Sequence, residues 1–469
     1  MNPLWMLVPV PLIACGSALL APVTRIPSLC AAAMLVQVFV AFFTCAIMPP
    51  TDGVATFFVL VTTCVTAASL LHASFYFEAE RAVGHAPGPR TMRGVYFFAP
   101  LFVLSMYGVV VADDLGLLWV AMEASTLLSA PLVYYRGTRT SLEATWKYLM
   151  MCSVGIAFAF FGTATLYAAS QTVAGLGEGT LSLQALLAHA SQLPGDRMRL
   201  AFVFLLLGYG TKAGLFPLHS WLPDAHSEAP APFSALLSGA LLNCALVALW
   251  RVAGLAAAAG QLAFVQATLL PMALATVGVA SLFLIRQHDI KRLLAYSSME
   301  NVGIMAVAIA LGAGGAFGAQ ALNHSLAKVA LFLLAGNLMQ ATGTKKIRGL
   351  RGVFEHRPAQ GLLLLLAALA AVGTPPFGSF IAEWGVLAAA VSAHHYTAMG
   401  VVVASLAVAF VAISMHVTSM VFGGAPRDWK TAGDPRGTRG WLVPAMLVAA
   451  ALALGLLAAP GLLMLAGGL

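Results

Sequence analysis

Charged residues are scarce in this chain. Only 9% of its 469 residues are Asp, Glu, Lys or Arg, whereas 60% are hydrophobic. A soluble protein of this length carries about 25% charged residues, so the composition excludes a soluble globular domain. Apolar runs of about 20 residues, the length that lets a helix cross a bilayer, recur along the chain. The sequence therefore predicts an all-α polytopic membrane protein surrounded by lipid.

Motifs that hold redox centres or nucleotides are also missing. The six cysteines all lie in apolar runs and no two form a CxxC pair, which argues against a zinc site, an iron–sulfur cluster and a disulfide framework. There is no GxxxxGK[ST] loop and no GxGxxG motif between a strand and a helix. We therefore expect no cofactor in this chain and no nucleic acid partner, and any redox chemistry would belong to other subunits. Whether the chain is part of an enzyme stays open.

The basic residues are distributed unevenly. Dividing the apolar runs at their polar loops predicts about fourteen transmembrane helices. Nineteen of the 24 Lys and Arg residues then follow odd-numbered helices, and only Arg197, Arg199 and Arg251 lie on the opposite side. Because basic loops stay cytoplasmic, this alternation supports the helix count and predicts periplasmic termini. The expected organisation is helices 1–3 in residues 1–93, helices 4–8 in 94–259, helices 9–13 in 260–422, and a loop with helix 14 in 423–469.

Proline and glycine interrupt two of the expected helices. The seventh covers residues 198–216, breaks at Pro217 and resumes over 223–238, before an eighth helix at 240–259. The twelfth is broken by the segment GTPPFG at 373–378. The interval of five helices is odd, so the two broken helices enter the membrane in opposite directions. Interrupted helices in oppositely oriented halves indicate an inverted-repeat transporter, here with two five-helix repeats.

Two charged side chains fall inside apolar runs of the first half. Glu123 lies mid-helix, where a charge costs roughly 2.5–3.5 kcal/mol on insertion scales. It is either a carboxylate bonded to Ser or Thr of a neighbouring helix, or an ionic partner of Lys212. Lys212 lies one turn before Pro217, and a buried lysine titrates readily. Snorkelling to the membrane surface is the alternative for Lys212, but its position well inside its run favours proton transfer.

The second half carries four more candidates. His324 and Lys328 are spaced i, i+4 on one helix face, and histidine titrates near neutral pH, so this pair is suited to pass protons along a water-lined path. A core histidine is the alternative for His324. Glu383 follows the second break and is a candidate proton acceptor, unless free N–H groups at the start of a half-helix satisfy it. Glu300 is either part of the path or an interfacial acid.

A polar patch follows the first break. It contains His219, Asp224, His226 and Glu228. The two histidines are further candidates for the proton path. A metal site is disfavoured, because Asp224 is expected to cap the resumed half-helix.

Several of these segments together resemble a known family. They are similar to the antiporter-like proton-translocating subunits shared by respiratory complex I, Mrp-type cation/proton antiporters and membrane-bound hydrogenases. The segments are MEASTLLS (122–129), KAGLFPLHSWLPDAHSEAPAPFSALLSG (212–239), DIKRLLAYSS (289–298), HSLAKVALFLLAGN (324–337) and GTPPFGSFIAEW (373–384). Within the family, LLNCALVALWR (241–251) and YSSMENVG (296–303) are most similar to the hydrogenase-4 and formate hydrogenlyase type.

The resemblance implies a fold, a site and partners. The implied fold is a fourteen-helix core with inverted five-helix repeats and broken helices seven and twelve. The implied proton-translocation residues are Glu123 paired with Lys212, His324 with Lys328, and Glu383. The implied partners are other antiporter-like membrane subunits and a soluble redox arm that carries NiFe and iron–sulfur centres, in the bacterial cytoplasmic (inner) membrane. The alternatives are a subunit of an Mrp-type cation/proton antiporter and a structural anchor with a vestigial proton path.

One position departs from the family pattern. Many relatives carry lysine or histidine in helix eight where this chain has Asn243. An asparagine amide binds and orients water but holds no proton at neutral pH. The link between the two halves must then run through water, or the path is interrupted at Asn243.

Overall fold

The computed structural model describes residues 6–47, 52–82, 88–425 and 440–457. In this part of the chain there are two isolated bridges and no strand, and almost every residue is helical. Nine helices among the described residues are long and apolar enough to cross a membrane, and four shorter ones are also apolar. The predicted all-α membrane fold is therefore confirmed. Both chain ends and the basic residues Arg427, Lys430, Arg436 and Arg439 lie outside the described residues.

Nineteen α-helices follow one another along the described residues. In chain order they are α1 (Pro9–Leu20), α2 (Ile26–Ile47), α3 (Gly53–Ala82), α4 (Pro89–Val111), α5 (Leu115–Val133), α6 (Arg139–Ser170), α7 (Leu183–Ala188), α8 (Gly195–Ala213), α9 (Trp221–Glu228), α10 (Ala231–Leu236), α11 (Leu242–Ala256), α12 (Leu262–Leu284), α13 (Ile290–Ala310), α14 (Gly314–Thr342), α15 (Val353–His356), α16 (Pro358–Ala371), α17 (Gly378–Ser392), α18 (Tyr396–Phe422) and α19 (Leu442–Leu457).

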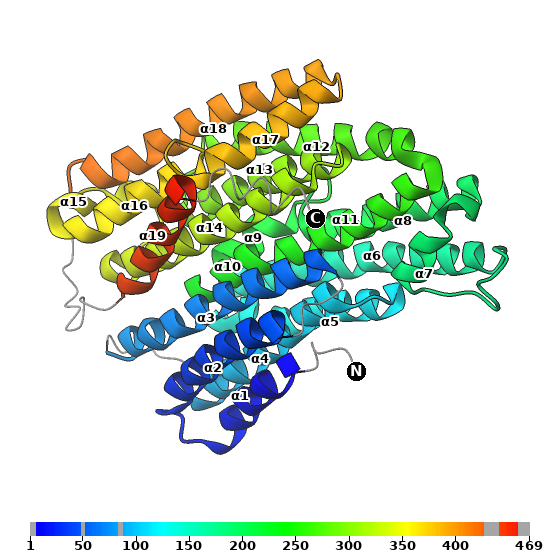
Figure 1. Ribbon diagram of the computed structural model, residues 1–469. Coiled ribbons are helices and arrows are strands. Elements are labelled where there is room, and N and C mark those ends of the chain that lie inside the picture. The colour runs from blue at the N-terminus through cyan, green and yellow to red at the C-terminus, as the bar shows by residue number, and fades with distance from the viewer. Residues whose placement is uncertain (1–5, 48–51, 83–87, 426–439, 458–469) are drawn as a thin grey trace.

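Two helices form the centre of the bundle. The best membrane-spanning window of α13 is 94% buried and that of α14 is 83% buried, whereas those of α2 and α18 are only 33% buried. Figure 1 shows α13 and α14 between α18 on one side and α1 to α4 on the other. These central helices carry Glu300, His324 and Lys328. The interior of the protein therefore contains ionisable side chains.

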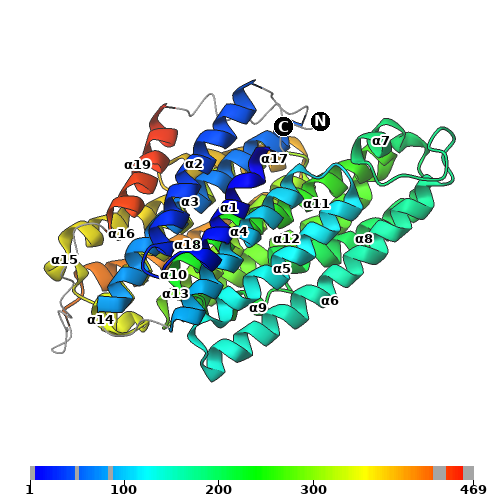
Figure 2. The ribbon, with the colours of Figure 1, turned by 90° about the horizontal axis from the view of Figure 1, so that it is seen from below.

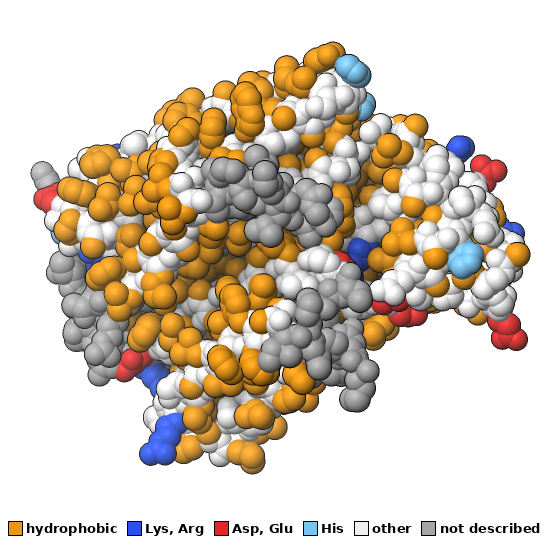
Figure 3. All heavy atoms as spheres, in the orientation of Figure 1, with side chains coloured by type: hydrophobic (Ala, Val, Ile, Leu, Met, Phe, Trp, Pro, Cys, Tyr) orange, Lys and Arg blue, Asp and Glu red, His pale blue; other side chains and the backbone are white. Residues whose placement is uncertain are grey.

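The outer surface is apolar. Large side chains such as Phe39, Phe161 and Trp384 are exposed, and in Figure 3 hydrophobic atoms cover most of the visible face. The charged side chains on that face lie mainly toward its left and right ends. An apolar belt with charges at the helix ends is the surface expected of a protein embedded in lipid.

Small residues let two of the site helices approach closely. A Cβ added at Gly208 of α8 would meet Ala159 and the backbone of α6, and one added at Gly155 would meet Thr211 of α8. Close backbone approach at small residues is how helices pack in membranes. Figure 2 shows α6 and α8 running side by side. This contact places Lys212, one turn after Gly208, against α6.

Side-chain caps fix the start of other site helices. Asp114 accepts a hydrogen bond from the N–H of Leu117 at the start of α5. Asp289 accepts from the N–H groups of Lys291 and Arg292 at the start of α13. Such caps satisfy N–H groups that have no partner within the helix.

The first predicted break is present, but its boundaries differ from the expectation. After α8 the chain turns at Gly214 (φ 80°) and resumes as the short helix α9. The sequence predicted that residues 231–238 complete the seventh helix. Instead, α10 begins at residue 231 and is followed by a π-helical turn, Leu237–Leu241. This turn leads directly into α11. Pro230 ends the preceding helix, and Pro232 occupies the first turn of the next one, where proline fits.

The second predicted break lies between α16 and α17. Gly373 adopts a positive φ of 66° there. The hydroxyl of Thr374 donates to the carbonyl of Leu369, and that of Ser379 donates to the carbonyl of Ala370. These bonds satisfy carbonyls that a continuous helix would have paired, as a break inside a membrane requires.

Candidate functional site

Lys212 is completely buried at the end of α8. Its ammonium donates to the hydroxyl of Thr126 on α5 at 2.8 Å and to that of Tyr148 on α6 at 2.9 Å. It also lies 4.9 Å from the centre of the Tyr148 ring, within the range of a cation–π interaction. The snorkelling interpretation of Lys212 is therefore wrong, because three helices enclose its charged end.

Hydrogen bonds continue from Lys212 in one direction. The Tyr148 hydroxyl lies 2.6 Å from that of Ser129, which in turn donates to the carbonyl of Ser125. An ammonium group can only donate, so Tyr148 accepts from Lys212 and gives its own hydrogen to Ser129. The hydroxyl groups of Tyr148 on α6 and Ser129 on α5 therefore form a polarised chain of hydrogen bonds that starts at Lys212.

Glu123 lies near this lysine without bonding to it. Both residues belong to the described part of the chain, and they form no direct ion pair. One Glu123 oxygen instead accepts from the hydroxyl of Ser153 on α6 at 2.8 Å, and the other is buried without a partner. Glu123 and Thr126 are spaced i, i+3 on α5, so they share a face. The Lys212 ammonium thus sits one helical turn from Glu123.

Lys328 has a comparable environment in the second half. It is completely buried on α14 and donates to the hydroxyl of Ser297 on α13. Glu300 lies one turn after Ser297 on the same helix, is only 2% exposed, and accepts from the Asn301 amide at 2.7 Å. Glu300 is therefore not an interfacial acid. Its helix, α13, packs against α14, the helix of Lys328.

Glu383 lies on α17 and is 6% exposed. Its carboxylate packs directly against Gly373, so a Cβ added at that glycine would overlap it. The helix after the second break, α17, packs against α13 and α14, the helices of Glu300 and Lys328. A glycine is needed at residue 373 both for its positive φ and for this close approach.

A π-helical turn connects α10 and α11 with α14. His324 is 2% exposed, and its Nε2 lies 3.2 Å from the carbonyl of Ser238. Because a carbonyl only accepts, Nε2 carries the hydrogen, and Nδ1 is buried without a partner. The carbonyl of Gly239 accepts from the hydroxyl of Ser325 at 2.7 Å. A π turn shifts the helical hydrogen-bond pattern and often marks functional sites.

Asn243 forms a bridge in the same place. Its amide nitrogen donates to the hydroxyl of Ser325 at 2.8 Å and to the carbonyl of Gly239 at 3.1 Å. Its carbonyl oxygen is buried without a partner. Asn243 therefore ties α11 to α14 while one of its polar atoms stays available to bind water.

The structure separates the two histidines near the first break. His226 is completely buried and stacks on Phe332 of α14, with both ring nitrogens lacking partners. His219 is half-buried and packs beside Phe216 and Phe283. His226 faces α14, the helix of His324 and Lys328, whereas His219 lies apart from them.

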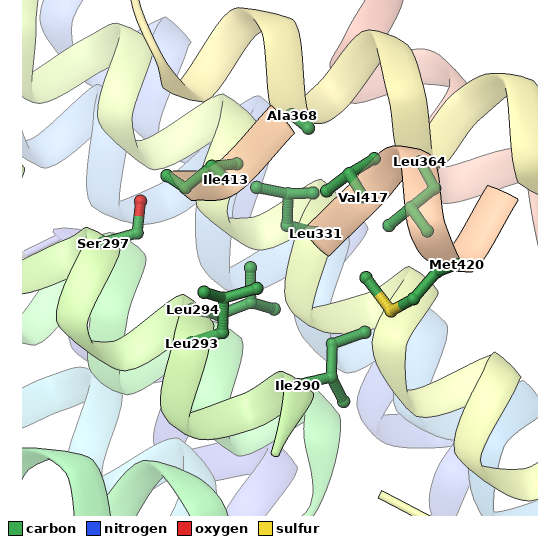
Figure 4. Close-up of a pocket in the computed structure, with 10 residues that line it drawn as sticks. All are labelled: Ile290, Leu293, Leu294, Ser297, Leu331, Leu364, Ala368, Ile413, Val417 and Met420. Atoms are coloured by element: carbon green, nitrogen blue, oxygen red, sulfur yellow. The ribbon is translucent and has the colours of Figure 1, made fainter. Parts of the chain in front are cut away.

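An apolar cavity of about 10 Å³ lies beside Ser297. In Figure 4 the hydroxyl of Ser297 lies at one side of this cavity and apolar side chains surround the rest. A water molecule needs about 10–15 Å³ and two to four polar partners, so this cavity is dry. Its lining residues are Ile290, Leu293, Leu294, Ser297, Leu331, Leu364, Ala368, Ile413, Val417 and Met420.

Comparison with known proteins identifies the family. Residues 112–408 match the family described as NADH:quinone oxidoreductase/Mrp antiporter, TM. The chain belongs to this family. A hydrogenase-4 component F homolog from Methylacidiphilum infernorum (isolate V4) is 39% identical over 339 residues, which are 71% of this chain and 70% of that protein.

Two solved structures of respiratory membrane complexes contain chains with the same fold. A chain of respiratory complex I from Thermus thermophilus has a TM-score of 0.79 at 25% identity, over 98% of this chain and 99% of that one. A chain of the membrane-bound sulfane sulfur reductase, an archaeal respiratory membrane complex, has a TM-score of 0.87 at 24% identity. The match covers 100% of this chain and 97% of that one. The protein is therefore an antiporter-like membrane subunit similar to those of hydrogenase-4, complex I and Mrp.

Several residues of this antiporter-like site were not predicted from the sequence. Thr126, Tyr148 and Ser297 contact the two lysines. A signal existed for Thr126 and Ser297, since each lies three positions from a candidate glutamate. Tyr148 has no such signal.

The predicted cap at Asp224 is wrong. Helix α9 follows Ser220 without any side-chain cap, and Asp224 lies within its first turn. The Asp224 carboxylate instead forms ion pairs with Lys147 and Arg292.

Proposed function

We propose that the chain translocates protons as one subunit of a multi-subunit, redox-driven ion pump. One observation carries the proposal. Two buried lysines, Lys212 and Lys328, each donate a hydrogen bond to a hydroxyl group one helical turn from a glutamate. Buried ionisable groups in a membrane interior mark ion pathways, because a purely structural role would not offset their cost.

The proposed path has two halves joined by the π turn. Lys212 with Glu123 holds a proton in the first half, and Lys328 with Glu300 and Glu383 holds one in the second. A lysine releases its proton more readily when an opposite charge moves away, and binds it more tightly when that charge approaches. Glu123 is free to act in this way, since one of its oxygens has no fixed partner.

The connection between the halves would use water at Asn243 and His324. The free Asn243 oxygen and the free His324 Nδ1 are both buried on the α11–α14 interface. An amide orients water without holding the proton itself, while the histidine ring can accept and return one. Asn243 then serves as a water-binding position in place of the titratable residue of many relatives.

The topology proposed for this function has about fourteen membrane crossings and two inverted five-helix repeats. The Gly/Pro breaks after α8 and between α16 and α17 would be corresponding positions of the repeats. The uneven distribution of basic residues supports periplasmic termini and a location in the bacterial cytoplasmic membrane. The partners would be other antiporter-like membrane subunits and a soluble redox arm, with NiFe and iron–sulfur centres on those partners.

Replacement of Lys212 tests this proposal. The complex containing Lys212→Ala, reconstituted in proteoliposomes, is expected to keep its subunits while redox turnover no longer acidifies the vesicle interior. Arg199→Gln is the matched control, because Arg199 is an exposed cation whose ion-pair partner, Asp196, is also exposed. Proton pumping by Lys212→Ala at the wild-type rate would overturn the proposal.

An Mrp-type cation/proton antiporter subunit is the second candidate. The family match carries it, since the family description includes Mrp antiporters. Mass spectrometry of the purified complex separates the two candidates. Hydrogenase-type redox subunits support the pump, whereas a complex of small membrane subunits with no redox protein supports the antiporter.

A further inference from the structure

Ion pairs gather around one short helix. Five ion pairs form a group around α9. The group joins α9 to α6, to the start of α13 and to the loop after α14. Its members are Glu143, Lys147, Asp224, Glu228, Asp289, Arg292 and Lys345.

Asp224 joins two helices that are distant in the sequence, α6 and α13. One of its carboxylate oxygens lies 3.0 Å from Lys147 of α6, and the other lies 2.6 Å from Arg292 of α13. The Asp224 side chain is 18% exposed, whereas both cations are 47% exposed. A single exposed pair contributes little. A mostly buried carboxylate held from two opposite sides fixes the position of its helix.

The other end of α9 is held as well. Lys291 is buried, and its ammonium donates to the carbonyls of Ser227 and Ala229. These carbonyls lie at the end of α9, where no following turn of the helix supplies N–H groups to bond them. Lys345 pairs with Glu228 at 2.9 Å. Cations at the carboxyl end of a helix satisfy its last carbonyls and its dipole. Lys291 and Lys345 therefore hold the carboxyl end of α9, whereas Asp224 holds its first turn.

The first residue of α9 reaches the lysine site. Trp221 is completely buried, and its indole N–H donates to the carbonyl of Thr211 at 2.8 Å. Its ring lies 4.9 Å from the ring of Tyr148, centre to centre, at 42°. Tyr148 is the residue whose hydroxyl and ring face both contact Lys212. Asp224 is thus connected to Lys212 through Trp221 on its own helix and through Tyr148.

We propose that Asp224 is a positioning residue for Lys212. Its two ion pairs hold α9 so that Trp221 keeps Tyr148 in contact with the ammonium. Loss of the pairs lets α9 shift, and Tyr148 then no longer accepts the hydrogen bond from Lys212. This inference rests on the proposed function, because its consequence is measured as proton pumping.

Asp224→Asn tests the inference in the reconstituted complex. The substitution keeps the shape of the side chain and removes its charge, and we expect pumping to fall about tenfold, the change produced by losing a hydrogen bond to a charged group. Asp224→Glu is expected to restore most of the rate. Glu143→Gln is the matched control: Glu143 pairs with the same Lys147 but does not touch α9, and its side chain is 65% exposed, so no change is expected.

A double substitution shows whether Asp224 acts through Tyr148. Residues that act through one contact have non-additive effects. We expect Asp224→Asn to reduce pumping no further in a Tyr148→Phe background. Effects that simply multiply would overturn the inference. If Asp224→Asn prevents assembly, Arg292→Gln and Lys147→Gln, which each remove one of the two pairs, take its place in the same comparison.

The outcomes separate this inference from the proposed function. Wild-type pumping by Asp224→Asn, combined with no pumping by Lys212→Ala, overturns the positioning role and leaves proton translocation standing. Wild-type pumping by both variants overturns the proposed function. Reduced pumping in Glu143→Gln equal to that of Asp224→Asn would assign the effect to Lys147 alone, and it would also overturn the role of α9.

Discussion

The Lys212 ammonium donates a 2.8 Å hydrogen bond to the Thr126 hydroxyl. This bond keeps the lysine one helical turn from Glu123, whose own partner is Ser153. Lysine and glutamate are thus close but separate, each held by a hydroxyl group. A small movement of either side chain would convert this arrangement into an ion pair.

Thr126→Val is expected to lower proton pumping about tenfold. Valine has nearly the shape of threonine, but it removes one acceptor from a charged donor, and such bonds contribute about 1.5–3 kcal/mol. The rate of vesicle acidification measures the effect. Thr165→Val is the control, since the Thr165 hydroxyl bonds only to the carbonyl of Phe161 in its own helix. Equal rates in the two variants would contradict the role given to Thr126.

Ser297→Ala is expected to impair the second half in the same way. It removes the hydroxyl that accepts from Lys328, so the ammonium loses an acceptor in a buried site. We expect a fall in pumping of about tenfold without loss of the complex on native gels. Ser281→Ala is a suitable comparison, because Ser281 is buried but bonds to the carbonyl of Val277 in its own helix. A normal rate for Ser297→Ala would show that Lys328 does not need this contact.

Gly373→Ala is expected to displace Glu383. Its Cβ would overlap the carboxylate, and the positive φ of 66° adds backbone strain of about 1–3 kcal/mol. Gly312→Ala separates the two causes, since Gly312 has a φ of 69° and no atom within 4 Å of an added Cβ. Both variants should lose thermal stability, but only Gly373→Ala should also lose pumping. Equal pumping in both would argue against Glu383 as a proton acceptor.

Asn243→Leu tests the connection between the halves. Leucine has a similar size and removes the amide that bridges Gly239 and Ser325. We expect pumping to stop while electron transfer by the complex continues, because the side chain at residue 243 would no longer bind water. Continued pumping would place the connecting path elsewhere. A structural anchor with a vestigial path predicts wild-type properties in this variant and in Lys212→Ala.

The sequence predicted those parts of the fold and site that depend on local signals. Prolines marked both helix breaks, and the lysines and glutamates stood out because charge is costly inside apolar runs. The boundary after the first break was wrong, because Pro230 ends one helix and Pro232 fits the first turn of the next. Residues 231–238 therefore joined α11 and not α9.

Contacts between distant segments could not be predicted. Asp224 looks like a helix cap in the sequence, but its partners Lys147 and Arg292 come from helices that only folding brings together. Tyr148 is one of ten tyrosines in the chain, and nothing in its neighbourhood indicates that it faces Lys212. The importance of both residues arises from the packing of α6, α9 and α13.

The dry cavity beside Ser297 has an electrical consequence. A membrane potential of about 100 mV drives a single charge with only about 2.3 kcal/mol. A charged group would have to lose its bound water to cross an apolar region. The free energy of an isolated charge rises there by roughly tens of kcal/mol, far more than the membrane potential supplies. The side chains of Leu331, Leu364 and Ile413 therefore form an apolar barrier beside Ser297 that a hydrated charge would not enter.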